Sequence, residues 1–350
     1  MIFNNISELI SYAEHNDISN IDIRLEKCTN DVLKNPILKK ISFLNIEATE
    51  VTEIPKELSN LRTLDCGYTD IIRIPKEFIN LRYLYCSRTY LKEIPKELVS
   101  LTELYCSRTY IIGVPKELIN LQKLECYTTR ITRIPKELIN LHFLNCFSTQ
   151  LLEIPKELIN LRILNCSDTN ITEIPKELSN LQQLYCSRTH ITEIPISFVN
   201  LTILDCSDTY VTEIPISFVN LTILDCSDTY VTRIPKELIN LIKLNCSDTY
   251  VTEIPKELIN LRKLTCPDTK ITRIPKELIN LEYLVCSDTY VTEIPKELIN
   301  LQLLACKDTN IKEIPINLDL LEYIDSDFIT LKEHEVNVKK YKKEIINRCQ

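Results

Sequence analysis

The sequence is poor in glycine and in histidine. It has only two glycines and four histidines among 350 residues. Two glycines cannot build the glycine-rich loop that surrounds a phosphate group. The histidines are His15, His142, His190 and His334, and none of them stands with a serine, cysteine or carboxylate in a recognisable triad. The sequence therefore predicts that the protein is not an enzyme.

Long apolar segments are also missing. No run of 18 apolar residues occurs, whereas a membrane-spanning helix needs about 20. The first residues have no basic stretch and include Glu8 and Glu14, so they do not look like a secretory signal. The formal net charge of -8 disfavours nucleic acid and anionic membranes as partners. We therefore expect a cytoplasmic protein whose partner is neither a nucleic acid nor a membrane.

What the sequence has in abundance is a repeat of twenty residues, which runs from Ile41 to beyond Leu320. Its places are counted here from 1 to 20 along Leu161 to Asn180, LRILNCSDTNITEIPKELSN. Apolar or small residues occupy places 1, 4, 6, 11, 14 and 18, with Thr at 9 and Pro at 15. Places 4 and 6 alternate as in a strand, whereas 14, 18 and the next 1 are spaced as on a helical turn. Each repeat is therefore predicted to form a short strand, a turn and a compact return, in which the proline suits the start of a one-turn helix.

Two stretches of the repeat carry a family resemblance. The run L-x-x-L-x-C-x-x-T-x-I resembles the leucine-rich repeat signature, with Cys in place of Leu at place 6 and Thr in place of Asn at place 9. The run I-P-K-E-L-x-N-L resembles the return segment of the short type of that family. The composition is most similar to leucine-rich repeat proteins of mimivirus-like giant viruses. The resemblance implies an α/β fold, a right-handed horseshoe solenoid with a parallel sheet on its concave face and short helical or extended convex returns.

The extent of the repeat predicts three segments. Residues 1–40 do not follow it and are expected to form an N-terminal cap, in which Asn5 and Glu8 resemble a helix capping box. Residues 41–330 form the repeat array. Residues 331–350 are expected to form a C-terminal capping helix. Each cap would cover the stacked core that the terminal repeat of a solenoid otherwise exposes to water.

Thirteen of the fifteen cysteines occupy place 6. On neighbouring parallel strands their side chains would lie side by side, whereas a disulfide needs Cβ atoms that point toward each other. A zinc site needs four converging ligands rather than a straight row. We therefore expect reduced cysteines that pack as small apolar groups, and no metal or other cofactor. A thiol-based metal-binding or redox-responsive protein stays open as an alternative.

The variable places 3, 5, 8 and 10 are predicted to face the concave side. Asp at place 8 lies in a Ser-Asp-Thr turn, where its side chain can accept a backbone N–H. Asp205 and Asp225, at strand place 5, have no such structural reason in the sequence, and carboxylates stacked on neighbouring strands repel each other. Aspartates surrounding apolar and aromatic side chains are typical of a protein-binding surface. The candidate partner-binding residues are Asp205, Asp208, Asp225, Asp228, Asp248, Asp288, Ile203, Ile223, Tyr283, Tyr210 and Tyr230.

These patterns predict a non-catalytic scaffold for protein–protein interaction whose concave face is acidic in its C-terminal half. The expected partner is a protein or peptide with a basic surface. The resemblance to giant-virus proteins implies a host partner and a location in the host cytoplasm. A second interpretation is a substrate-recognition adaptor of a ubiquitin ligase complex, which requires residues 1–40 to fold as a partner-binding helical module.

Overall fold

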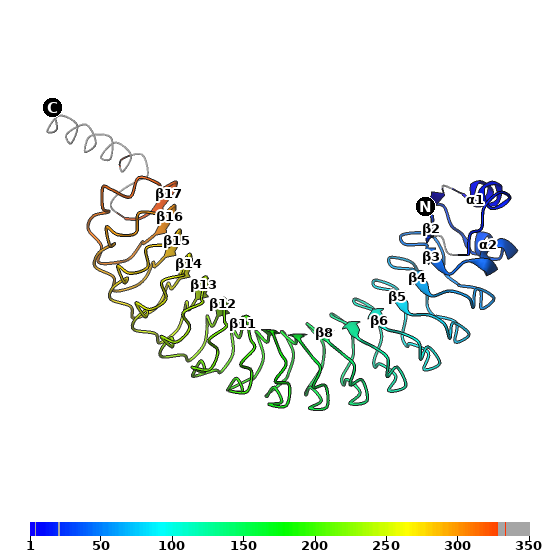
Figure 1. The fold of residues 1–350 in the computed structure, drawn as a ribbon, viewed down its shortest axis with the longest axis horizontal. Helices are drawn as coiled ribbons and strands as arrows, with labels where there is room; N and C mark the ends of the chain where they lie inside the picture. The colour runs from blue at the N-terminus through cyan, green and yellow to red at the C-terminus, as the bar shows by residue number, and fades with distance from the viewer. Residues whose placement is uncertain (4, 20–21, 328–332, 334–350) are drawn as a thin grey trace. The chain divides into compact units, whose positions relative to one another are not determined.

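The structure is a computed structural model that describes residues 1–3, 5–19, 22–327 and 333. The chain divides into two compact units, Met1–Asn180 and Leu181–Gln350. The C-terminal helix predicted over 331–350 lies outside the described residues, apart from position 333. Within each unit, short strands stand side by side and pair in parallel (Figure 1).

In the first unit, the described residues form nine strands and the helical segments of the chain's first forty residues. The helices are α1 (Ile6–Ala13), α2 (Asn30–Leu33) and the 3-10 helix η1 (Pro36–Lys40). The strands are β1 (Ile2–Phe3), β2 (Asp22–Leu25), β3 (Phe43–Asn45), β4 (Thr63–Asp65), β5 (Tyr83–Tyr85), β6 (Glu103–Tyr105), β7 (Lys123–Glu125), β8 (Phe143–Asn145) and β9 (Ile163–Asn165).

The described residues of the second unit form eight strands, and equivalent places of neighbouring coils are paired directly. Ile203 pairs with Ile223, and Asp205 pairs with Asp225. The strands are β10 (Gln183–Tyr185), β11 (Ile203–Asp205), β12 (Ile223–Asp225), β13 (Lys243–Asn245), β14 (Lys263–Thr265), β15 (Tyr283–Val285), β16 (Leu303–Ala305) and β17 (Tyr323–Asp325). The predicted parallel-sheet solenoid with coils of twenty residues is confirmed.

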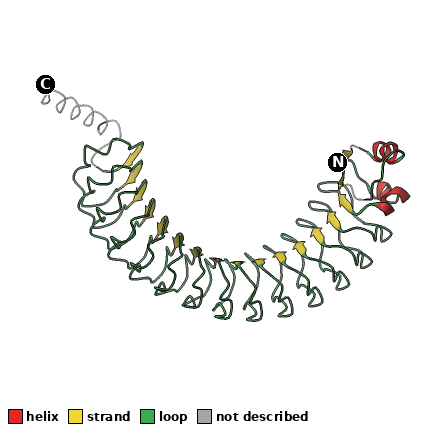
Figure 2. Ribbon diagram, in the orientation of Figure 1, coloured by secondary structure: helices red, strands yellow, loops and turns green. Residues whose placement is uncertain are grey.

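Each coil closes around the apolar places of the repeat. In the coil that begins at Leu221, the side chains of Leu224 at place 4 and Cys226 at place 6 are buried, as are those of Val231 and Leu238. Burying one such aliphatic side chain contributes about 1.5–3 kcal/mol. The return is built from turns and is drawn as loop in both units (Figure 2). The one-turn helix expected after the proline is therefore wrong in detail, because the N–H of place 18 bonds the proline carbonyl three residues earlier and closes a tight turn.

Two side-chain ladders accompany the backbone pairing. Thr209 Oγ1 donates to the Cys206 carbonyl at 2.6 Å, and the same bond recurs along the array. The hydroxyl thus closes its own coil and does not bond the neighbouring one. At the opposite end of the strands, the place-20 side chain reaches the previous coil, as Asn220 Nδ2 donates to the Val199 carbonyl at 3.1 Å. The threonines shape each coil, and the asparagines tie one coil to the next.

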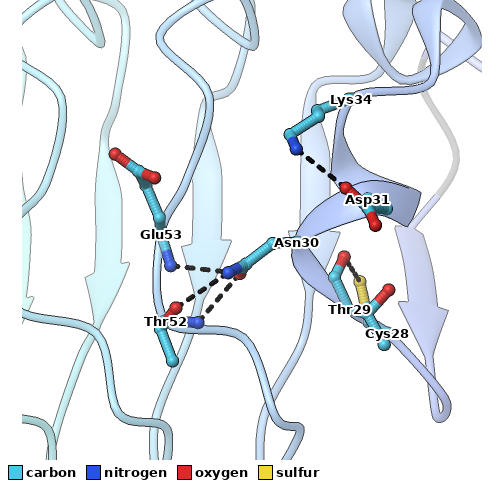
Figure 3. Close-up of polar contacts among 7 residues, drawn as sticks. All are labelled: Cys28, Thr29, Asn30, Asp31, Lys34, Thr52 and Glu53. Atoms are coloured by element: carbon cyan, nitrogen blue, oxygen red, sulfur yellow. Dashed lines mark hydrogen bonds and ion pairs between the residues drawn. The ribbon is translucent and has the colours of Figure 1, made fainter.

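The N-terminal segment continues the sheet of the first unit. Strand β2 pairs in parallel with β3, and Ile23 and Leu25 are buried on its inner face. Helix α1 begins at the predicted cap, because the Glu8 N–H donates to Asn5 Oδ1 at 3.1 Å. Asn30 at the start of α2 accepts the N–H of Thr52 at 3.0 Å and donates to its hydroxyl at 2.8 Å (Figure 3). These bonds fasten the first forty residues to the first coil of the array.

Candidate functional site

The aspartates at strand place 5 have a structural role that the sequence interpretation missed. Asp205 Oδ1 accepts the N–H of Ser207 at 3.1 Å and its hydroxyl at 2.7 Å. Asp225 holds Ser227 in the same way, at 3.0 and 2.7 Å. This arrangement is an Asx turn, in which a side chain caps the backbone two residues ahead. The prediction that Asp205 and Asp225 lack a structural reason is therefore wrong.

The electrostatic environment of Asp205 is unfavourable for its charge. Burial raises the pKa of Asp205, and the charge of Asp225 on the neighbouring strand adds to that effect. The two bonds from Ser207 and the positive charge of Arg188 act in the opposite direction. Asn165 and Asn245 make the same turn at place 5 without a charge. The place-5 carboxylate is therefore exchangeable for an amide as far as the turn is concerned.

The aspartates at place 8 are held by their backbone rather than by their side chains. The φ angle of this place is positive in fourteen consecutive coils, at 51° to 57°, whatever the residue type. Asp and Asn tolerate this left-handed conformation better than most other residues. The Asp208 N–H donates to the Ser227 carbonyl of the next coil at 2.9 Å. The Asx turn expected at place 8 is thus made from place 5 instead, and the place-8 aspartates are exposed.

These carboxylates form an exposed column in the second unit. Asp208, Asp228, Asp248 and Asp288 are all exposed, and within the described residues none of the four shows a side-chain hydrogen bond or ion pair. Partial burial raises the pKa of Asp248, and the charges of Asp268 and Asp228 raise it further. The carboxylates therefore repel one another along the column, and a cationic ligand would relieve that repulsion.

A stack of rings runs beside the aspartate column. Tyr210 and Tyr230 lie with ring centroids 6.2 Å apart and planes 13° apart, and Tyr230 and Tyr250 lie 6.2 Å and 16° apart. His190 stacks on Tyr210 at 6.1 Å. The backbone fixes this order, because the Tyr230 N–H donates to the Val211 carbonyl of the preceding coil at 3.0 Å. Each of these tyrosines is about half exposed, at 49% to 51%.

The ring spacing shows on which side of the coils this stack lies. Paired strands are about 4.8 Å apart, and the stacked rings of Tyr85 and Tyr105 on strands β5 and β6 of the first unit are 4.6 Å apart. The place-10 rings are spaced more widely, at 6.2 Å. The coils therefore fan apart between the sheet and the place-10 loops. Place 10 lies on the turn side of the sheet, not on the strand face where the sequence interpretation put it.

The aspartate column and the ring stack line one groove in the second unit. It has a volume of about 960 Å³. Its floor is formed by the buried place-9 threonines, and its lining runs from Arg188 to Asp308. Among the predicted residues, those in the groove are Asp208, Asp228, Asp248, Asp288, Tyr210 and Tyr230. The groove also contains Tyr290 of the same tyrosine column, and Lys270, which reading the whole of place 10 as one column would have identified.

The other predicted residues lie on the strand face outside this groove. Ile203, Ile223 and Tyr283 occupy place 3 and are half-buried. The ammonium of Lys263 lies 4.2 Å from the centre of the Tyr283 ring. The predicted set is thus divided between two surfaces, the strand face and the groove beside the turns.

The first unit carries different charges at the same places. Arg88 and Arg108 stand at place 8, where the coils of the second unit have aspartate from Asp208 to Asp308. The Arg88 guanidinium lies over the Tyr68 ring at 4.9 Å. At place 10, Tyr90 stacks on Tyr110 at 6.0 Å and 9°. A ring stack is therefore present in both units, whereas the carboxylate column beside it belongs to the second unit.

The cysteine column is buried in both units. Fourteen cysteines are described, and all of them are buried and outside any disulfide. Cys86 Sγ donates to the Tyr105 carbonyl of the next coil at 3.3 Å, and Cys146 Sγ to the Asn165 carbonyl at 3.3 Å. Burial raises the pKa of Cys106 and of Cys166 to about 12. Protonated, enclosed thiols are poor nucleophiles and poor metal ligands. In the described part of the chain no three or more His, Cys, Asp or Glu side chains converge as a metal site would require.

Comparison with known proteins agrees with this geometry. The sequence model of the family described as Leucine Rich Repeat matches residues 160–181. No curated protein matches the chain. A leucine-rich repeat protein of Leptospira interrogans superposes with a TM-score of 0.80 at 24% identity, over 94% of this chain and all of that one.

Two further structures are similar. A functional domain of InlJ from Listeria monocytogenes, described as including a cysteine ladder, gives a TM-score of 0.70 at 24% identity and covers 78% of this chain and 69% of that one. The plant peptide hormone receptor RGFR1, in complex with RGF2, gives 0.70 at 24% identity, over 89% of this chain and 60% of that one. The fold is that of leucine-rich repeat proteins. Among the described residues, no helix is both long and apolar enough to cross a membrane.

Proposed function

We propose that the protein is a non-catalytic scaffold that binds a basic protein or peptide through the groove of its second unit. The observation that carries this proposal is the exposed aspartate column beside a tyrosine stack in one groove. Tyrosine supplies large contact area, and unpaired carboxylates supply charge complementarity to a cationic partner. Neighbouring folds support a binding role, since one of them is a receptor in complex with a peptide hormone.

The proposal also covers where the protein acts. Its net charge of -8 supports a protein partner rather than a nucleic acid or an anionic membrane. The column of parallel cysteines supports a reducing, cytoplasmic location. If the composition reflects a giant virus, the location is the host cytoplasm and the partner is a host protein.

The two other interpretations have less support in the structure. A ubiquitin ligase adaptor needs a separate helical module at the N-terminus, whereas β2 pairs with β3 and Leu9 of α1 is fully buried. A thiol-based sensor needs an accessible, low-pKa cysteine, whereas the described cysteines are buried and desolvation raises the pKa of Cys66 and its neighbours. Neither interpretation is favoured by a specific observation.

Removal of the groove carboxylates tests the proposal. The variant Asp208→Asn/Asp228→Asn/Asp248→Asn keeps the left-handed backbone, because Asn tolerates it as well as Asp. Immobilised wild-type protein should retain from source-cell extract a set of proteins that about 300 mM salt releases, since salt screens exposed charges. The triple variant should fail to retain the same set.

The matched control is Asp168→Asn, which removes a carboxylate at the same place of the first unit, at a φ of 57° against 51° to 53° for the three aspartates of the second unit. It should retain the same proteins as the wild type, identified by mass spectrometry. Equal retention by the triple variant would contradict the proposal.

A further inference from the structure

The tyrosine stack of the second unit ends on a cation. Lys270 follows Tyr250 in the place-10 column, and its ammonium lies 5.8 Å from the centre of the Tyr250 ring. The shorter stack of the first unit ends in the same way, because the Arg130 guanidinium lies 5.3 Å from the centre of the Tyr110 ring. A positive charge over a tyrosine face is a favourable arrangement. In both units, therefore, a cationic side chain covers the last ring of the continuous stack.

The groove carries these rings and the place-8 carboxylates in one lining. Asp208, Asp228 and Asp248 alternate with Tyr210, Tyr230 and Tyr250 along the same lining. A guanidinium is planar and carries donors in a fixed fork, so it can stack on a ring and bond a carboxylate at the same time. An ammonium is a point charge and cannot do both equally well. The lining therefore suits arginine better than lysine.

The spacing of the rings along the groove indicates which backbone conformation a bound peptide would have. The rings recur every 6.1 to 6.2 Å. In an extended peptide, every second side chain points to the same face, and two residues span roughly 6.6 Å. Over three intervals the mismatch with the rings is only about 1.2 Å, which a long arginine side chain can absorb. Arginines at every third position would point alternately toward the groove and away from it.

We propose that the groove binds an extended peptide segment with arginines at alternate positions, each lying against the exposed part of a place-10 tyrosine and paired with a place-8 carboxylate. The segment belongs to the basic partner, so this inference rests on the proposed function and specifies its ligand. The first unit does not offer the same site, because Arg88 and Arg108 replace the carboxylates beside the stack of Tyr90 and Tyr110.

Two labelled peptides of identical composition test the inference. One is Arg-Thr-Arg-Thr-Arg-Thr-Thr and the other is Arg-Thr-Thr-Arg-Thr-Thr-Arg, both capped at their ends. Fluorescence anisotropy against the full chain should show at least tenfold tighter binding of the alternating peptide. Tyr230→Ala should weaken binding of that peptide about tenfold and remove the difference between the two. The matched control Tyr110→Ala, in the first unit, should leave both affinities unchanged.

The outcomes separate this inference from the proposed function. If both peptides bind equally and Asp208→Asn/Asp228→Asn weakens both, the alternating ligand is overturned while a basic partner for the groove is supported. If neither peptide binds, the inference is overturned, and the capture experiment judges the scaffold function independently. If Tyr230→Ala does not fold by circular dichroism, Asp228→Asn replaces it and should reduce the preference for the alternating peptide by the same mechanism.

Discussion

The two units have the same framework but differ in the charge of their exposed places. Place 4 is leucine and place 6 is cysteine in both Leu104–Cys106 of the first unit and Leu224–Cys226 of the second. Place 8, in contrast, carries Arg88 and Arg108 in the first unit but aspartate in every coil of the second from Asp208 to Asp308. The core therefore fixes the coil, whereas the exposed places vary in charge without altering it. Function is to be sought in that variation.

The largest expected effect tests whether the two frameworks are truly equal. Leu104→Ala and Leu224→Ala each empty a fully buried position. Each should lower the free energy of unfolding by about 3 kcal/mol, since the lost burial is accompanied by a cavity. Chemical denaturation followed by circular dichroism measures both. A difference of more than about 1 kcal/mol between them would show that the units differ in their cores as well as on their surfaces.

Exchanging the place-8 charges should move the binding activity between the units. Asp208→Arg/Asp228→Arg gives the second unit the charges of the first and should weaken binding of the alternating peptide about thirtyfold, or about 2 kcal/mol. The cause is repulsion in place of attraction beside the rings. Anisotropy titration at low salt measures this loss.

The reverse exchange, Arg88→Asp/Arg108→Asp, places carboxylates beside Tyr90 and Tyr110. It should add a weaker second site, visible as an increased stoichiometry in calorimetry. An unchanged stoichiometry would mean that the charge at place 8 is not what distinguishes the units.

A smaller effect concerns the backbone of place 8. Thr128 in the first unit has φ 55°, and a β-branched residue is strained in this conformation. Thr128→Asn should therefore stabilise the protein by about 1 kcal/mol. Asp228→Thr in the second unit should destabilise it by a similar amount. Thermal unfolding measures the change in stability of both variants, and the two changes should have opposite signs. Equal signs would contradict the strain argument.

The smallest expected effect is the pH dependence that Asp205 contributes. Its pKa is raised in the folded protein by burial and by Asp225, so the folded state binds the proton more tightly than the unfolded state. The charge of Asp205 therefore costs stability once the pH rises above about 4, the ordinary Asp pKa, and the full cost applies above the folded pKa.

Asp205→Asn keeps the turn that Asn245 makes at the same place. It should raise the free energy of unfolding by about 0.5 kcal/mol at pH 7, the size of a cross-strand charge pair. The gain should disappear below about pH 4. Thermal unfolding at pH 3.5 and pH 7 measures it. A gain in stability that grows as the pH falls would show that the charge of Asp205 does not lower the stability of the folded protein.

The sequence was sufficient to predict the structure of each coil, but not the arrangement of the side chains on its surface. Periodicity alone placed Leu224 and Cys226 inside, because only those places recur with apolar residues. The start of the first helix at Asn5 could also be predicted, because its capping residues Asn5 and Glu8 lie three positions apart in the sequence. The side on which place 10 lies could not be predicted, because it depends on how the coils fan apart from the strands toward the loops.

The sequence interpretation also assigned the Asx turn to the wrong aspartates, those of place 8 instead of those of place 5. Asp205 and Asp208 lie three residues apart, on either side of the turn. Which of them caps the turn depends on the left-handed backbone at Asp208, and no residue pattern reveals this when Arg88 and Thr128 adopt the same angle. Residue type was informative about the charge of the groove, but not about which carboxylate is committed to the backbone.

The ladder of place-20 asparagines has a mechanical consequence. Asn120, Asn140 and Asn160 each bond the carbonyl 21 residues earlier, and the backbone hydrogen bonds between coils join residues 19 to 21 apart. Each coil of the array is thus clamped only to its immediate neighbours. Under tension at one end, such an array should therefore unfold one coil at a time, starting from that end. Every step lengthens the chain by roughly 70 Å, the extended span of one repeat.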